Sequence, residues 1–294
     1  MAVHSHDNMD WDAHLQRLRE RDELRAPETA ELAGELLRPE DRVVVDIGAG
    51  AGGSAAAFAE SLAGSGGAVT IVDSAPELLS EAVARAQRSA GSGVEVRSVT
   101  ADAASDELVT AVRSINGGGA DLVFASFFVH HLPDQLAGLR RLAELLAPGG
   151  RLAVLEAGLE PRVLPWDVGF AEPGLEGRLV AARGEWFRRM REEIPGSVRL
   201  PVGWSEALSQ AGLQEVGSWS SLIDRPAPVS GVALSVVLGH LEWLREDAEQ
   251  RVSDDDVRAI DALLDPESPQ YAEKRRDLGY LRADTVHVGT RPLT

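Results

Sequence analysis

The feature that most constrains this chain is a short apolar run that passes through one acid into a turn of small residues. Residues 43–53 read VVVDIGAGAGG. Branched residues followed by glycines predict a buried strand that turns tightly into a helix. The turn from Gly48 to Gly53 fits the pattern G-x-G-x-x-G. Small residues there let backbone N–H groups approach a phosphate, a carboxylate or a closely packed cofactor, so the turn predicts a ligand site without naming the ligand.

Strand and helix patterns alternate along the chain from this point. The expected strands are 43–47, 68–72, 94–99, 121–128 and 151–156, and the expected helices between them are 54–62, 76–89, 105–115 and 133–146. Such alternation is typical of an α/β fold with a doubly wound sheet and right-handed connections. The rhythm stops after residue 156. It resumes with a helix at 204–211, a strand at 215–223, helices at 232–245 and 254–264, and a last strand at 285–289.

These patterns indicate one domain with soft internal boundaries. We expect an N-terminal helical cap at 1–40, a ligand-binding core at 41–156 and a lid insertion at 157–200. Residues 201–294 are expected to complete the sheet and to carry inserted helices. Aromatic residues outside the core, such as Trp166 and Trp243, are suited to enclosing an apolar small molecule, although they are equally suited to an accessory core.

Composition excludes several classes of function. The net charge of the 294 residues is −18 at pH 7, and a surface so acidic would repel a phosphate backbone, which argues against nucleic acid as a partner. The chain has no cysteine, which removes disulfides, thiolate nucleophiles and cysteine-bound metal. The first ten residues lack the apolar stretch of a secretory signal, and no uncharged apolar run reaches about 18 residues. We therefore expect a cytoplasmic protein with no membrane contact.

Three acids follow three successive strands. Asp46 ends the first strand, Asp73 ends the second, and Asp102 comes directly after the third. The carboxyl ends of parallel strands lie at one edge of a sheet, where ligands bind in open α/β folds. A charge at Asp46 would disfavour a pyrophosphate and attract a cation, Asp73 suits ribose hydroxyls, and Asp102 suits an adenine amine. Each acid also suits the capping of a turn or a helix, and that alternative stays open for all three.

On these residues the chain resembles the class I S-adenosylmethionine-dependent methyltransferases. Residues 45–52 (VDIGAGAG) resemble the family's glycine motif, and residues 145–152 (LLAPGGRL) resemble its helix-turn-strand signature before the fifth strand. Residues 129–132 (VHHL) are similar to the segment after the fourth strand in the small-molecule branch related to quinone-biosynthesis methyltransferases. Residues 282–289 (RADTVHVG) are similar to the family's last strand.

The resemblance implies a Rossmann-like doubly wound sheet of seven strands, mostly parallel with an antiparallel last strand, and helical lid insertions. It implies S-adenosyl-L-methionine as the cofactor and S-adenosyl-L-homocysteine as its product. The residues expected to bind the cofactor are Asp46, Gly48, Ala49, Gly50, Asp73, Ser74, Asp102, Ala103 and Ser126.

The acceptor side rests on fewer residues. The resemblance selects His131 as the general base for an acceptor that carries a proton. Glu156, at the end of the fifth strand, faces the same edge of the sheet and is expected to orient the acceptor. Structural roles for both residues remain alternatives, and no metal is expected. The expected reaction is methyl transfer to an oxygen, nitrogen or carbon atom of a small, largely apolar organic acceptor in secondary metabolism. The expected assembly is a monomer or homodimer.

Three other functions stay compatible with the motifs to different degrees. A non-methylating enzyme with the same fold and cofactor, such as a cyclase, would keep the glycine turn and Asp73. A nicotinamide dehydrogenase is disfavoured by Asp46 and by the Pro-Gly-Gly signature at 148–150. A non-catalytic partner subunit is disfavoured by the intact series of motifs.

Overall fold

The computed structural model describes residues 10–246 and 251–293, which form two compact units. The first unit contains Met1–Gly158, Ile194–Ser221 and Asp284–Thr294, and the second contains Leu159–Glu193 and Leu222–Ala283. The segment expected as a lid insertion is divided between them, because 159–193 lies in the second unit and 194–200 in the first.

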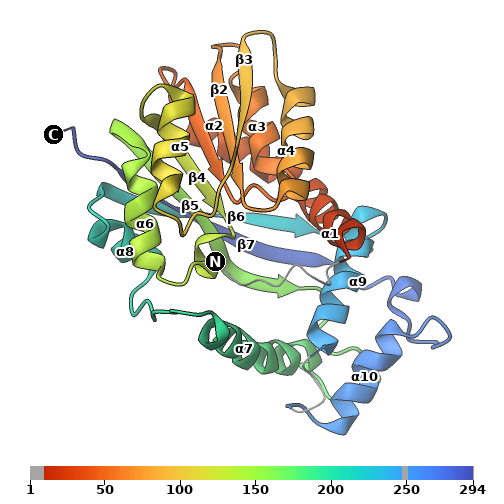
Figure 1. Ribbon diagram of the computed structural model, residues 1–294. Helices are drawn as coiled ribbons and strands as arrows, with labels where there is room; N and C mark the ends of the chain where they lie inside the picture. The colour runs from red at the N-terminus through yellow and green to blue at the C-terminus, as the bar shows by residue number, and fades with distance from the viewer. Residues whose placement is uncertain (1–9, 247–250, 294) are drawn as a thin grey trace. The chain divides into compact units, whose positions relative to one another are not determined.

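A seven-stranded sheet runs through the structure in the order β3-β2-β1-β4-β5-β7-β6 (Figure 1). The strands are β1 (Val43–Ile47), β2 (Gly67–Asp73), β3 (Val94–Thr100), β4 (Ala120–Ser126), β5 (Leu146–Arg162), β6 (Gln214–Arg225) and β7 (Tyr280–Thr290). The pairs from β3 through β5 are parallel. The sequence-based prediction of a seven-stranded, mostly parallel sheet is therefore confirmed.

The last strand runs against its neighbours, as predicted. Near one end of β5, the backbone N–H of Gly149 donates to the carbonyl of Arg291 at 3.0 Å. Beyond the other end, the N–H of Gly279 donates to the carbonyl of Val163 at 3.3 Å. Residue numbers that rise on β5 while they fall on β7 identify an antiparallel pair.

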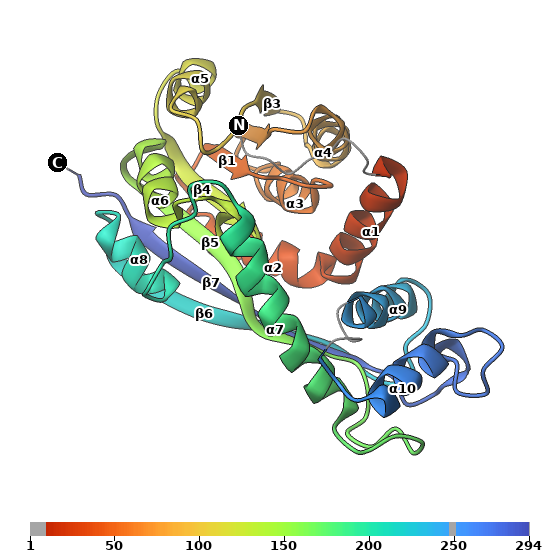
Figure 2. The ribbon, with the colours of Figure 1, turned by 60° about the horizontal axis from the view of Figure 1, so that its bottom comes forward.

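Helices cover both faces of the sheet in the first unit (Figures 1 and 2). One face carries α2 (Ala26–Leu36), α3 (Gly53–Ser61) and α4 (Pro76–Ser89), and the other carries α5 (Glu107–Asn116), α6 (Gln135–Glu144) and α8 (Trp204–Gln210). Val44 packs with the first set, whereas Val45 and Ile47 pack with the second. Since side chains alternate along a strand, this pattern points Asp46 toward the α3 face.

The start of β1 is held by one carboxylate. Asp121, at the start of β4, accepts hydrogen bonds from the backbone N–H groups of Arg42 at 2.7 Å and Val43 at 2.9 Å. The strand that leads into the glycine turn is thereby fixed in register with β4, where Val44 pairs with Leu122 and Ile47 with Ala125.

The segment Ala147–Gly150 belongs to a strand, whereas the sequence predicts a helix stop and a tight turn there. The structure includes it in β5, which begins at Leu146 rather than at the expected 151. The register shows why: Ala120 pairs with Leu146, and Leu122 pairs with Arg151, so the extra residues form a bulge. Gly149 takes a left-handed φ of 80° within it. The chain does turn at Gly149, as its residues predict. Because the residues on both sides of the turn pair with β4, the turn lies inside β5 as a bulge.

The second unit is built around three helices, α7 (Leu175–Glu193), α9 (Val232–Arg245) and α10 (Asp254–Leu264). The buried Glu176 accepts from the backbone N–H groups of Val163 and Leu164, and Arg178 pairs with Asp256 at 2.6 Å. Trp243 stacks on His240, with ring centroids 5.7 Å apart. In the part of the chain that the structure describes, none of the helices has both the length and the apolar character that crossing a membrane requires.

Candidate functional site

The glycine turn joins β1 to α3 in a conformation that requires glycine. Gly48, Gly50 and Gly52 have φ values of 67°, 54° and 82°, a region that L-residues with a side chain rarely adopt. A Cβ added at Gly48 would lie 2.2 Å from the ring of Phe128. The segment after β4 therefore packs directly on the turn, and the absence of a side chain at Gly48 is what allows it.

Asp73 ties the end of β2 to the same turn. One of its carboxylate oxygens accepts from the backbone N–H of Ala75 at 2.9 Å, and the other from Gly50 at 3.4 Å. The capping role considered from the sequence is thus present, and a contact with the turn accompanies it. The exposed Ser74 follows it, before α4.

Asp46 is the most deeply buried of the three predicted acids, with 1% of its surface exposed. The backbone N–H of Ala55 in α3 donates to its carboxyl, while Oδ2 has no hydrogen-bond partner in the part of the chain that the structure describes. Burial, and then the charges of Asp22 and Asp73, raise the pKa of this carboxyl to about 8. Burial without a counter-charge thus favours the neutral form of this carboxyl.

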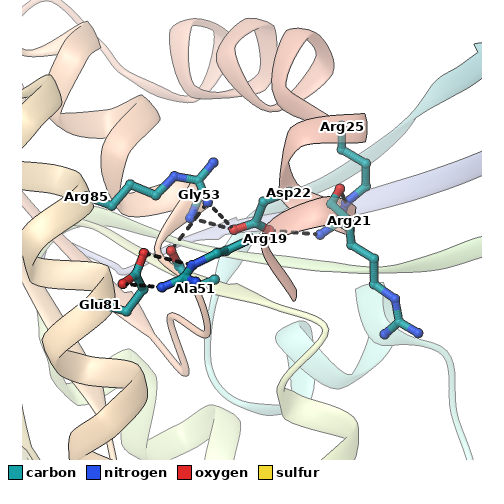
Figure 3. A network of polar contacts seen from close by, with 8 residues as sticks. All are labelled: Arg19, Arg21, Asp22, Arg25, Ala51, Gly53, Glu81 and Arg85. Carbon is teal, nitrogen blue, oxygen red and sulfur yellow. Dashed lines mark hydrogen bonds and ion pairs between the residues drawn. The ribbon is translucent and has the colours of Figure 1, made fainter. Parts of the chain in front are cut away.

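Asp22 is a residue of this site that the sequence did not reveal. It lies in α1 (Trp11–Leu24), within the charged stretch RLRERDELR, where the pattern indicates a solvated helix face. Figure 3 shows its carboxylate directed at the N–H of Gly53, 2.9 Å away, and at Arg85 of α4, 2.8 Å away. Burial raises the pKa of Asp22, and the two arginines beside it, Arg25 and Arg85, act against that rise.

Arg25 connects α1 to the segment that follows β4. Its guanidinium lies 3.6 Å from Asp22, 3.5 Å from Asp284 of β7, and 4.8 Å from the centroid of the Phe127 ring. Phe127 has a left-handed φ of 49°, a strained conformation for a residue with a side chain. Strain of this kind is concentrated at functional sites. Through Arg25, the glycine turn, α1 and the end of β4 form one connected region.

The remaining predicted cofactor residues lie at the same edge of the sheet. Asp102 follows β3, is half-buried, and accepts from the N–H of Ala104 at 2.8 Å, which is the capping role considered above. Its neighbour Ala103 is buried. Ser126 is the half-buried last residue of β4.

The two histidines after β4 are placed differently from each other. The Nδ1 atom of His130 lies 2.7 Å from the Glu156 carboxylate, which also faces the His130 backbone N–H at 3.4 Å. Glu156 is buried, and it lies within β5 rather than at the end of that strand. His131 is exposed, its ring centroid 4.1 Å from that of His130. Both belong to a single 3₁₀ turn, η2 (Val129–His131). The structure brings Glu156 to His130, whereas the sequence favoured His131.

Comparison with known proteins gives this geometry its context. Residues 45–152, which contain the glycine turn and all three acids, match a family model described as a methyltransferase domain. The fold is shared with an O-methyltransferase family protein from Burkholderia thailandensis, at a TM-score of 0.51 and 17% identity, covering 98% of this chain and 61% of that one. Residues 45–152 are therefore a methyltransferase domain of the S-adenosylmethionine-dependent kind.

Two kinds of enzyme are found among the relatives of the methyltransferase. A trans-aconitate 2-methyltransferase of Methylobacterium radiotolerans is 28% identical over 293 residues, covering 94% of this chain and 97% of the relative. A ubiquinone biosynthesis O-methyltransferase of Xanthomonas axonopodis pv. citri is 36% identical over 129 residues, covering 43% of this chain and 47% of the relative. The second match is thus confined to less than half of either protein.

The cofactor of the methyltransferase is S-adenosylmethionine, and the turn has the properties that this molecule needs. A cationic ligand is favoured by the carboxyls of Asp22, Asp46 and Asp73, and the buried Oδ2 of Asp46 has no hydrogen-bond partner among the described residues. A dinucleotide would bring a pyrophosphate to the same carboxyls. Among the described residues, no three His, Asp or Glu side chains are grouped as a metal ion would require.

Proposed function

We propose that the methyltransferase methylates an oxygen, nitrogen or carbon atom of a small, largely apolar organic acceptor in secondary metabolism, and that His130 removes the proton of that acceptor. The observation that carries the proposal is the contact between His130 Nδ1 and the buried Glu156 carboxylate at 2.7 Å. The relatives named for trans-aconitate and for ubiquinone biosynthesis support a small organic acceptor.

The pair has the arrangement of a base and its orienting group. A carboxylate that accepts from Nδ1–H fixes the imidazole in the tautomer whose Nε2 carries the lone pair. Glu156 is buried within β5, and its contact with Nδ1 restricts the ring of His130. His130 is only half-buried, as a group must be if it is to reach a substrate. In this proposal Glu156 positions His130. This role replaces the one expected from the sequence, in which Glu156 orients the acceptor.

The other residues act on the cofactor. We propose that the turn from Gly48 to Gly50, including Ala49, and the carboxyls of Asp46 and Asp73 hold its amino-acid and ribose parts, with Ser74 and Ser126 beside them. Asp102 and Ala103 then line the adenine end. When bound, the cofactor supplies an electrophilic methyl group on a sulfonium, which is a good leaving group. The protein contributes mainly alignment and exclusion of water, worth about 7–11 kcal/mol in well-oriented reactions.

The test is product formation with candidate acceptors. The protein is incubated with S-adenosylmethionine and a panel of phenols, hydroxyquinones and unsaturated carboxylic acids. The expected products are S-adenosylhomocysteine and an acceptor that is heavier by the mass of one CH₂ group, since one methyl replaces one hydrogen. Conversion of an acceptor with no release of S-adenosylhomocysteine would instead indicate a cyclase-type reaction and would refute methyl transfer.

Asp73→Asn is expected to weaken cofactor binding by about tenfold or more. The amide oxygen of asparagine can still accept from Ala75, so the turn before α4 is retained, but the charge is lost. Hydrogen bonds to a charged group contribute about 1.5–3 kcal/mol, and 1.4 kcal/mol is a factor of ten. Calorimetric titration with S-adenosylhomocysteine measures the change, and an affinity equal to that of the unaltered protein would exclude Asp73 from the cofactor site.

A further inference from the structure

The Asp46 carboxyl occupies an unusual position for an acid. It is 1% exposed and receives one hydrogen bond from the Ala55 N–H, and its Oδ2 atom has no hydrogen-bond partner in residues 10–246 and 251–293. Burying a carboxylate without a counter-charge is costly, and a protein responds by keeping the group protonated. Among the described residues no cation pairs with Asp46, so a bound ligand with a positive charge would supply its counter-charge.

The charged groups around Asp46 reinforce this state. Asp22 from α1 and Asp73 from β2 place two further carboxyls near it. The nearby cations are directed at Asp22 instead: Arg85 of α4 at 2.8 Å and Arg25, at the end of α1, at 3.6 Å. Arg25 also faces Asp284 of β7. α3 contributes a backbone N–H and no charge. The arrangement favours a neutral Asp46 until a cation arrives.

We propose that Asp46 holds a proton in the cofactor-free protein and releases it to water when S-adenosylmethionine binds, so that donor binding is coupled to loss of one proton. The bound species then pairs the Asp46 carboxylate with the positive charge of the cofactor. The exchange balances in charge: the protonated Asp46 carboxyl is neutral and the donor, with its sulfonium, ammonium and carboxylate, has one net positive charge. The complex with ionised Asp46 is then neutral at this pair, and the positive charge leaves as the released proton. The inference depends on the cofactor alone and not on the proposed acceptor.

The coupling makes donor affinity depend on pH in a defined direction. Since burial raises the pKa of Asp46 to about 8, the proton must be removed during binding at any lower pH. The dissociation constant is expected to rise about tenfold for each pH unit below 8, until the pKa of the donor-bound state is reached. Above pH 8 the carboxyl is already ionised, so Asp46 adds no further dependence on pH.

The measurement is isothermal titration with S-adenosylmethionine, without acceptor, in two buffers of different ionisation enthalpy. At pH 7 the unaltered protein is expected to release close to one proton, and this number should fall toward zero above pH 9. Asp46→Asn is expected to release none, to bind more weakly, and to show an affinity independent of pH. Asp22→Asn removes a neighbouring charge, so its release curve is expected to shift to lower pH.

The control is Asp106→Asn, the same change at a carboxylate that is 97% exposed and pairs with Arg141. Its proton release is expected to match that of the unaltered protein. Binding at pH 7 without proton release would overturn the proposal, and so would a release that persists in Asp46→Asn. If Asp46→Asn does not fold, the two-buffer measurement on the unaltered protein still decides the question.

Discussion

Replacing His130 with alanine is expected to lower kcat by about 10²–10⁴-fold, the contribution typical of a general base. The reason is that Glu156 orients the His130 imidazole at 2.7 Å, and alanine removes the only part of this pair that is exposed enough to meet an acceptor. Cofactor affinity is expected to change little, because the Gly48–Phe128 packing and the Asp73 contacts remain. Single-turnover rates with saturating S-adenosylmethionine separate these two effects.

The same change at His131 decides between the two imidazoles. His131→Ala is expected to cost less than about tenfold, since His131 is exposed and the Glu156 contact belongs to its neighbour. Glu156→Gln is expected to lie between them: the amide oxygen still accepts from Nδ1–H, but the negative charge that favours the protonated imidazole is lost. A larger loss at His131 than at His130 would restore the assignment made from the sequence and refute the pair as the base.

Gly48→Ala is expected to lower the free energy of unfolding by roughly 2–4 kcal/mol and to weaken cofactor binding as well. A left-handed φ of 67° costs an L-residue about 1–2 kcal/mol, and a Cβ 2.2 Å from the Phe128 ring forces a displacement of similar cost. Because Phe128 belongs to the segment that carries His130, that displacement is also expected to disturb the acceptor side. Urea denaturation and calorimetric titration measure the two losses.

Two other glycines provide the comparison. Gly50 has a φ of 54°, but of the described residues a Cβ there would meet only Leu18, at 3.9 Å. Gly50→Ala is therefore expected to show the strain without the clash. Gly34 lies inside α2, where an added Cβ would meet no described atom within 4 Å. Gly34→Ala is expected to stabilise the protein by about 0.5–1 kcal/mol. Equal stability losses at Gly48 and Gly50 would contradict the role assigned to Phe128.

Local patterns were sufficient for most of the fold. The strand at 43–47 and the helices at 76–89, 232–245 and 254–264 were predicted with their observed bounds, because each is marked by a turn residue, a capping residue or a change of period. β5 was predicted too short, since its extension beyond Glu156 depends on pairing with β7, more than a hundred residues away.

In the candidate site, too, some residues are predictable from their neighbours in sequence, and others depend on contacts between distant segments. The glycine turn, Asp46 and Asp73 were predictable because a strand end, a turn and an acid lie within a few residues of each other. Asp22 was not, because its burial results from the packing of α1 near the turn, while its own sequence context is a charged helix. The choice between His130 and His131 was likewise beyond local information, since it depends on which ring faces Glu156, 25 or 26 residues further along.

The attachment of α1 has a consequence for how enzymes of this kind can diverge. Of the fourteen residues of this helix, all of them described, Leu24 is the one that is fully buried, and Arg19 and Asp22 reach α4 and the turn through charged groups. The helix also precedes the segment that matches the methyltransferase family model, which begins at residue 45. Substitutions in α1 can therefore alter the electrical potential at the turn and leave both the motif and the sheet intact. Donor affinity becomes a property that evolution, or an engineer, can adjust from outside the domain that identifies the enzyme.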